Sequence, residues 1–321
     1  MNYSLNQLYH VAGMSKQAVC QYKKRQDAFD VKVILLVKEA ELLREEHPGC
    51  GVEKMYYTLA PGFIGRDRFI ELFMQLGFRL KRKKNYKRTT FSVLAYYPNL
   101  ITGMLLHSPN QVWQSDITYI KVVDRFYYAV FIIDVYTKKI VGYNVSDSLR
   151  ATANVKALKM ALKINSPPAI HHSDKGSQYI YSKYIDLLQD NNIAISMCDT
   201  ALDNAYAERI NQTIKNEYLA YWNPSTFKQL KTDVNKAVKQ YNNRRIHNRI
   251  GRKAPTIFEK EVLNLSVQSR PKETIYTDGQ LKMEVASSHH PFFAEQNLQD
   301  LICPINFDKN ESIFLTKNGQ L

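Results

Sequence analysis

The feature that most constrains the fold of this chain is a change of pattern near residue 111. Three runs rich in β-branched and aromatic residues follow, at 117–123, 126–134 and 139–146, and short polar turns join them. Helical periodicity and short apolar runs then alternate. The further expected elements are a helix over 151–164, a strand that ends at Asp174, a helix over 182–191, a strand over 193–198 and a long helix from Asp203. This order predicts an α/β fold with a mixed five-stranded sheet and helices on both of its faces.

The beginning of the chain carries helical rather than strand periodicity. Residues 1–30 fit a small helix-turn-helix, in which Ala12 and Gly13 form the turn and Ser15 caps the second helix. Such a second helix would carry basic and amide side chains able to enter the major groove of DNA. A short amphipathic hairpin without a DNA-binding role is the alternative for this segment.

A second all-α region is expected over 31–88. It starts with a strongly periodic helix over 31–47. Two shorter helices, 52–60 and 66–76, then flank a turn at 61–65 that contains proline and glycine. These two helices predict a helix-turn-helix that binds DNA.

Basic side chains gather at the second of these short helices. Arg66 and Arg68 lie at its start, where a recognition helix approaches DNA. The segment 79–88 that follows has seven basic residues and no acid, and each phosphate that such residues neutralise adds sequence-independent affinity. The phosphate contacts predicted there are Lys81, Arg82, Lys83, Lys84, Lys87 and Arg88.

The composition also favours a nucleic acid partner. The formal net charge is +14, with 44 Lys and Arg against 30 Asp and Glu. No apolar run is long enough to span a bilayer, and the N-terminus lacks the pattern of a signal peptide. The four cysteines are scattered, which argues against a disulfide framework or a structural zinc site. We therefore expect a cytoplasmic, nucleoid-associated protein that binds DNA and no membrane.

Three carboxylates stand in distinctive contexts. Asp116 lies in Trp-Gln-Ser-Asp-Ile-Thr, Asp174 in His-His-Ser-Asp-Lys-Gly, and Glu208 in Asp-Asn-Ala-Tyr-Ala-Glu-Arg. Carboxylate oxygens suit Mg²⁺ or Mn²⁺ better than zinc. Two such ions can activate the attacking oxygen and stabilise the leaving oxygen of an in-line phosphoryl transfer. The three acids therefore predict an enzyme that cuts or joins nucleic acid.

The sequence also suggests how these acids meet. Asp116 is expected at the head of the first strand and Asp174 at the end of its neighbour. Asp203 and Asn204 are expected to cap the helix that carries Glu208. The apolar face of that helix is predicted to comprise Ala207, Ile210, Ile214 and Tyr218. The residues on the same side as Glu208, predicted to touch a DNA end, are Asn211, Gln212 and Lys215.

A basic segment follows the long amphipathic helix expected over 225–245. Its density of charge favours a phosphate-binding surface over a plain solvated face. The contacts predicted there are Arg244, Arg245, His247 and Arg249. The remaining boundaries place a linker over 89–110, the catalytic core over 111–260 and a C-terminal tail of unknown role over 261–321.

The order of these motifs resembles the integrase-core (DDE) transposases of bacterial insertion sequences, most closely the insertion-sequence-three family. The resemblance covers roughly residues 40–260. The motifs that carry it are Trp113-Gln-Ser-Asp116-Ile-Thr118, Ile133-Asp-Val-Tyr-Thr-Lys-Lys-Ile-Val-Gly142, His172-Ser-Asp174-Lys-Gly-Ser-Gln-Tyr179, Asp203-Asn-Ala-Tyr-Ala-Glu208 and Tyr241-Asn-Asn-Arg-Arg-Ile-His247. The resemblance implies a ribonuclease-H-like core in which Asp116, Asp174 and Glu208 bind two Mg²⁺ or Mn²⁺ ions.

It further implies DNA cleavage followed by strand transfer, with the terminal inverted repeats of the element and a target DNA as partners. A homo-oligomer, at least a dimer, is expected because two element ends must be brought together. An upstream reading-frame product is a further partner if the chain acts as one portion of a fusion. The alternatives are an inactive or host-adapted DNA-binding protein, a ribonuclease-H-like nuclease that cuts without joining, and, more weakly, a tyrosine recombinase.

Overall fold

The computed structural model describes residues 4–11, 13–80, 97–198 and 201–275. All of them belong to one compact unit that spans Met1–Asp278; a second unit, Gly279–Leu321, lies outside the described residues. The predicted phosphate contacts between Lys81 and Arg88 also lie outside them, as does the tail beyond residue 275.

Two helices open the described chain. Helix α1 spans Leu5–Val11, and α2 spans Lys16–Glu46. Ser15 caps α2 as predicted, because its hydroxyl accepts a hydrogen bond from the backbone N–H of Ala18 at 3.1 Å. The predicted break near residue 30 is wrong: α2 is one helix of 31 residues, since no glycine or proline interrupts its good helix formers. In the part of the chain that is described, no helix is long and apolar enough to cross a membrane.

The second predicted pair of helices is confirmed. Helix α3 spans Val52–Leu59 and α4 spans Arg66–Gln75. The two pack against the last turns of α2 around Met55, Phe69 and Phe73, which are fully buried.

The predicted mixed sheet is confirmed, and its strand order is β4-β3-β2-β5-β6. The first three strands are antiparallel, whereas β5 runs parallel to β2 and β6 runs parallel to β5. This is a ribonuclease-H-like arrangement. The strands are β2 (Val112–Val122), β3 (Arg125–Asp134), β4 (Ile140–Ser146), β5 (Ile170–Ser173) and β6 (Ala194–Met197).

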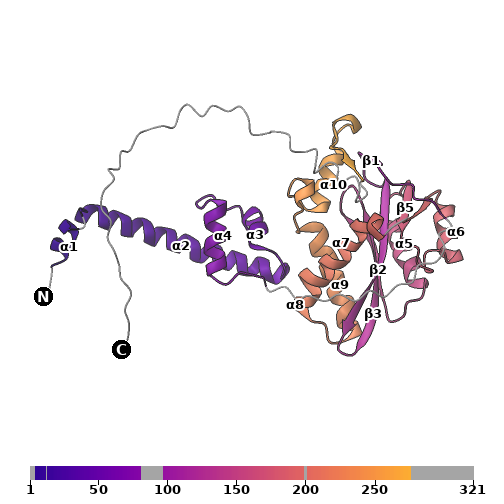
Figure 1. The fold of residues 1–321 in the computed structure, drawn as a ribbon, viewed down its shortest axis with the longest axis horizontal. Coiled ribbons are helices and arrows are strands. Elements are labelled where there is room, and N and C mark those ends of the chain that lie inside the picture. Colours follow the sequence, from indigo (N-terminus) through magenta and orange to yellow (C-terminus); the bar gives the residue numbers. More distant parts are fainter. Residues whose placement is uncertain (1–3, 12, 81–96, 199–200, 276–321) are drawn as a thin grey trace, which may run out of the picture. The chain divides into compact units, whose positions relative to one another are not determined.

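Helices cover both faces of this sheet (Figure 1). On β3, Phe131 and Ile133 face one core while Val130 and Ile132 face the other, so the strand is apolar throughout its second half. One face packs against α5 (Thr152–Ile164) and α6 (Ser182–Asp190). The other packs against α7 (Ala205–Thr213), the π-helix η2 (Ile214–Leu219) and α9 (Phe227–Asn243).

The long helix predicted from Asp203 is a composite. A 3-10 turn, η1 (Ala201–Asn204), precedes α7, and the short α8 (Ala220–Trp222) follows η2. Its predicted apolar face is confirmed, since each of the following is at most 1% exposed: Ala207, Ile210, Ile214 and Tyr218.

The segments on either side of the core pack on it and on each other. Strand β1 (Leu105–Leu106) pairs antiparallel with β7 (Glu273–Thr274), although the first was predicted as linker and the second as tail. Ile101 and Leu106 are buried in the same apolar cluster as Ile275. Both segments therefore pack as part of the core, because burying their apolar side chains is favourable. The remaining elements of this region are η3 (Asn248–Ile250), α10 (Pro255–Leu263) and η4 (Val267–Ser269).

Candidate active site

Asp116 and Asp174 are brought together by strand register. In the parallel pairing of β2 with β5, Ser115 lies opposite Ser173, which is the last residue of β5. The residue that follows each of these serines is an aspartate. Asp174 therefore follows its strand as predicted, whereas Asp116 lies inside β2 rather than at its head, because β2 begins at Val112.

The carboxylate of Asp116 is held on both oxygens. Its Oδ1 accepts a hydrogen bond from the backbone N–H of Ile117 at 2.8 Å, and its Oδ2 accepts one from the side-chain amide of Asn211 at 2.7 Å. Burial raises the pKa of Asp116 to about 7, and the negative charges of Asp174 and Glu208 add to the rise. The two hydrogen bonds act in the opposite direction but do not outweigh burial.

Asp174 lies in a tight turn after β5. Its Oδ1 accepts a hydrogen bond from the backbone N–H of Gly176 at 3.2 Å, and burial raises its pKa. A Cβ at Gly176 would lie 3.0 Å from the same oxygen, so a side chain there would press on the carboxylate. The hydroxyls of Ser115 and Tyr179 lie 3.0 Å apart in the buried layer next to this turn.

Glu208 projects from α7, whose start is anchored to β2. The side chain of Gln114 donates to the carbonyl oxygen of Asp203 at 3.0 Å, and that of Asn204 donates to the carbonyl oxygen of Ser115 at 2.9 Å. The sequence predicted that the side chain of Asn204 caps this helix, but it makes no capping hydrogen bond. It ties the start of the helix to β2 instead. Glu208 is exposed, yet partial desolvation and the charge of Asp174 raise its pKa.

The three carboxylates are thus neighbours, but their oxygens do not converge on one position. Among the residues described, no group of three or more His, Cys, Asp or Glu side chains is arranged to hold a metal ion. The side-chain donor atoms of the three acids are all oxygens. The softer ligands nearby are engaged elsewhere: His172 contacts the hydroxyl of Ser196 at 2.8 Å and the thiol of Cys198 at 3.2 Å. The donor set suits a hard divalent cation, provided that the carboxylates turn toward it.

Comparison with known proteins decides the family. Integrase core domain models match residues 107–201 and 191–255. The chain is 33% identical over 242 residues to the insertion element IS600 uncharacterized 31 kDa protein of Shigella sonnei, covering 72% of this chain and 88% of that protein. It is 32% identical over 233 residues to the transposase for insertion sequence element IS629 of the same organism, covering 70% and 79%. The chain belongs to the insertion-sequence transposases of the integrase superfamily.

Solved structures give more distant likenesses to this transposase. The catalytic core domain of HTLV-2 integrase in complex with magnesium aligns with a TM-score of 0.41 and 19% identity, over 47% of this chain and 97% of that one. The simian T-cell lymphotropic virus intasome in complex with a PP2A regulatory subunit aligns with a TM-score of 0.44 and 15% identity, over 68% and 73%.

The residues of the transposase predicted to touch a DNA end differ in accessibility. Gln212 is exposed on α7. Lys215 is half-buried, and its pKa is lowered by burial although the charge of Asp116 opposes the change. Asn211 is only 4% exposed, and its amide points at Asp116 rather than outward. The sequence placed Asn211 on the correct side of the helix but missed this role.

The predicted DNA contacts in the basic segment after α9 also differ in solvent accessibility. Arg244 and Arg249 are exposed, as a phosphate contact requires. Arg245 instead donates two hydrogen bonds to Glu217, each of 2.7 Å, and its guanidinium also contacts the ring of His247. The half-buried ring of His247 lies edge-on to Tyr241, and burial lowers its pKa to about 2. The side chains of Arg245 and His247 are therefore engaged within the protein, and their contact with DNA stays a prediction.

Arg66 and Arg68 are exposed at the first turn of α4. The guanidinium of Arg68 lies 4.7 Å from the centre of the Phe29 ring, and that of Arg66 pairs with Asp67. Both side chains are accessible from solvent at the start of the helix predicted to approach DNA.

Proposed function

We propose that this transposase cleaves the ends of an insertion sequence and transfers them to target DNA, with Asp116, Asp174 and Glu208 as its catalytic carboxylates. The observation that carries the proposal is the meeting of three acids from distant parts of the chain. Each has a raised pKa, and the charge of at least one other acid contributes for Asp116 and Glu208. A fold does not gather like charges for stability, so their proximity favours a functional role.

Asp116, Asp174 and Glu208 would hold Mg²⁺ or Mn²⁺, two ions at the site. Bound there, such ions would supply activation of the attacking oxygen and stabilisation of the leaving oxygen in phosphoryl transfer. Like charges at this edge of the sheet and an all-oxygen donor set support that fit.

The remaining side chains position the site and the substrate. Asn211 orients the Asp116 carboxylate. The charge of Asp116 acts on the ammonium group of Lys215, whose pKa it raises against the effect of burial. Lys215 and the exposed Gln212 are therefore suited to contact the phosphates of a DNA end. The protein supplies alignment and charge stabilisation, and no serine or tyrosine nucleophile is required.

DNA binding away from the acids would use basic surface on both helical segments. Arg66 and Arg68 at the start of α4 and the exposed Arg244 and Arg249 are suited to this role, together with the basic run at 81–88. The DNA partners would be the terminal inverted repeats and the target. Because two ends must be joined to one target, we expect a homo-oligomer, at least a dimer. An upstream reading-frame product is a further candidate partner.

A joining assay tests the proposal. Duplexes that carry the candidate element end, either uncut or with a free 3′-hydroxyl, are incubated with the purified protein, Mg²⁺ or Mn²⁺ and a supercoiled plasmid. Covalent attachment of the labelled end to the plasmid is the expected result. Cleavage of uncut ends without joining would instead favour a nuclease, and binding without either reaction would favour an inactive DNA-binding protein.

A further inference from the structure

The corner between α2 and α3 touches the π-helix η2. We call α7 and η2 together the catalytic helix, since α7 carries Glu208. The backbone N–H of Gly49 donates to the carbonyl oxygen of Glu217 at 2.8 Å. The Nδ1 atom of His47 lies 2.8 Å from the hydroxyl of the next residue, Tyr218. Glu217 and Tyr218 both belong to η2, which continues directly from α7 and therefore from Glu208.

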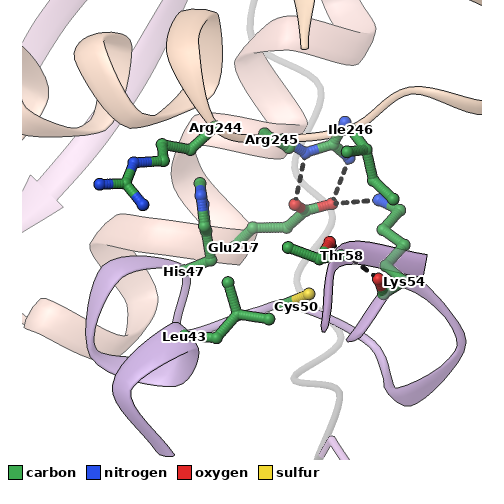
Figure 2. A pocket seen from close by; sticks show the side chains of 9 residues that line it. All are labelled: Leu43, His47, Cys50, Lys54, Thr58, Glu217, Arg244, Arg245 and Ile246. Atoms are coloured by element: carbon green, nitrogen blue, oxygen red, sulfur yellow. Dashed lines mark hydrogen bonds and ion pairs between the residues drawn. The ribbon is translucent and has the colours of Figure 1, made fainter. Parts of the chain in front are cut away.

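The side chain of Glu217 strengthens this contact from the other direction. Figure 2 shows its carboxylate between Arg245, which comes from the segment after α9, and Lys54 of α3. Both oxygens accept hydrogen bonds of 2.7 Å from Arg245, and the ammonium of Lys54 lies 3.7 Å away. One carboxylate thus links the helix-turn-helix, the catalytic helix and the C-terminal part of the core.

The backbones approach so closely that only glycine fits at the corner. A Cβ built on Gly49 would lie 2.4 Å from the Cα of Glu217 and 2.9 Å from its carbonyl oxygen. Gly49 has no positive φ, so its own backbone would accept another residue. The constraint at Gly49 therefore comes from the catalytic helix and not from the turn in which it lies.

The helix itself is unusual at this point. π-Helical turns are rare and are frequently found at functional sites. Here the π-turn spans Ile214–Leu219, and it follows the turns of α7 that carry Glu208 and Asn211. A displacement of η2 would be passed to those side chains, because a helix moves as a rigid element over so short a distance.

We infer that η2 is the docking site of the α2–α3 corner, and that this contact couples DNA binding by the helix-turn-helix to the position of the catalytic helix. The first half of the inference rests on the contacts of Gly49 and Glu217 alone. The second half also rests on the proposed function. Glu217 is then a positioning residue rather than a catalytic one.

Two glycines in the same turn give a matched test. Gly49→Ser places a side chain against Glu217, whereas Gly51→Ser places a Cβ that has no atom within 4 Å from the rest of the described residues, its chain neighbours apart. Serine is moreover favoured at the N-cap position that Gly51 occupies before α3. Hydrogen exchange of the full-length proteins is followed by mass spectrometry with and without an element-end duplex, beside end binding and cleavage. Glu217→Gln serves as a second variant that weakens the ion pair without adding a steric clash.

In the Gly49→Ser protein, we expect exchange in 47–50 and 214–219 to rise about tenfold or more over both the wild type and Gly51→Ser, as for local opening. The duplex should protect 214–219 in the wild type and not in Gly49→Ser. Cleavage should fall by about 5- to 150-fold, the usual span of coupling between sites, with end binding unchanged. Equal exchange in the two serine variants would overturn the docking. Raised exchange with undiminished DNA-induced protection would overturn the coupling, and both results stand even if no protein cleaves DNA.

Discussion

Asn211 donates a hydrogen bond from its side-chain amide to Oδ2 of Asp116, 2.7 Å away. The carbonyl oxygen of the same amide is buried and has no hydrogen-bond partner among the residues that the structure describes. The amide thus directs its N–H donor, rather than its oxygen, at the Asp116 carboxylate. The negative charges of Asp174 and Glu208 disfavour the ionised form of that carboxylate. Asn211 therefore holds the Asp116 carboxylate in its observed orientation.

Replacing Asn211 by leucine tests that role. The change keeps a buried side chain of similar size but leaves Oδ2 of Asp116 without its donor. We expect cleavage to fall by about 10- to 100-fold, with more Mg²⁺ needed for half of the maximal rate, as for other residues that orient metal ligands. Gln212→Leu, on the exposed neighbouring position, is the matched control and should retain more activity. Equal rates for the two variants would contradict the role given to Asn211.

The ion pair of Glu217 predicts a pH dependence of stability. Burial alone would raise the pKa of Glu217, but the hydrogen bonds and charge of Arg245 and the charges of Lys54 and His47 outweigh it and lower the pKa below 4.5. The pair therefore stabilises the fold above pH 4.5, and this contribution is lost as the pH falls through the lowered pKa. Glu217→Gln should lower the free energy of unfolding by about 3 kcal/mol at pH 7, since the Glu217 side chain is only 26% exposed.

Urea denaturation of the wild type and Glu217→Gln at pH 7 and near pH 4 measures this difference, which should shrink at the lower pH. Glu46→Gln is the control, because its partner Arg244 is largely exposed and 3.3 Å away. That variant should lose less than about 1 kcal/mol at either pH. A Glu217→Gln difference that stays constant with pH would contradict the assignment.

Gly142 should be required for packing and not for chemistry. It lies in β4, where a Cβ would come within 2.4 Å of the carbonyl oxygen of Ala157 in α5. Gly142→Ala should therefore cost about 1 to 3 kcal/mol of stability, as overpacking does in other cores. Thermal unfolding measures the loss, with Gly62→Ala as control because, its chain neighbours apart, no atom in the described part of the chain lies within 4 Å of a Cβ there. A melting temperature equal to that of the control would contradict the close approach of helix and strand.

Divalent ions should stabilise the protein through the three acids. A ligand at 100 times its Kd stabilises the state that binds it by about 2.7 kcal/mol, so saturating Mg²⁺ or Mn²⁺ should raise the melting temperature of the wild type. Asp174→Asn should lose most of that rise. Asp186→Asn, which alters an exposed acid on α6, should keep it. Equal shifts in all three proteins would place the bound ions elsewhere.

Much of the catalytic fold could be predicted because local pattern and burial agree there. The alternation of apolar residues on β3 reflects two separate cores, and the apolar face of α7 and η2 has helical spacing. The break predicted within α2 failed because a helix can continue through a polar stretch when nothing in it interrupts the backbone. The pairing of β1 with β7 was not predicted, because it joins segments that lie far apart in the sequence.

The acids of the site were visible in the sequence, but their supports were not. Asn204 resembled an N-cap, yet the carbonyl oxygen of Ser115 on a distant strand takes its amide. The ion pair of Arg245 with Glu217 was not predicted, because Glu217 lies 28 positions earlier, in η2. Partners of this kind depend on tertiary packing, and charge density along the chain does not reveal them.

The most direct test of the central claim is cleavage and strand transfer of labelled element ends by the wild type and by Asp116→Asn, Asp174→Asn and Glu208→Gln, each in Mg²⁺ and in Mn²⁺. Asp186→Asn serves as the matched exposed control. We predict that the wild type and the control cut and join, while each of the three variants binds the ends normally and loses both reactions. Cleavage or joining that survives in any of the three would contradict the assignment of that acid, and survival in all of them would contradict the site.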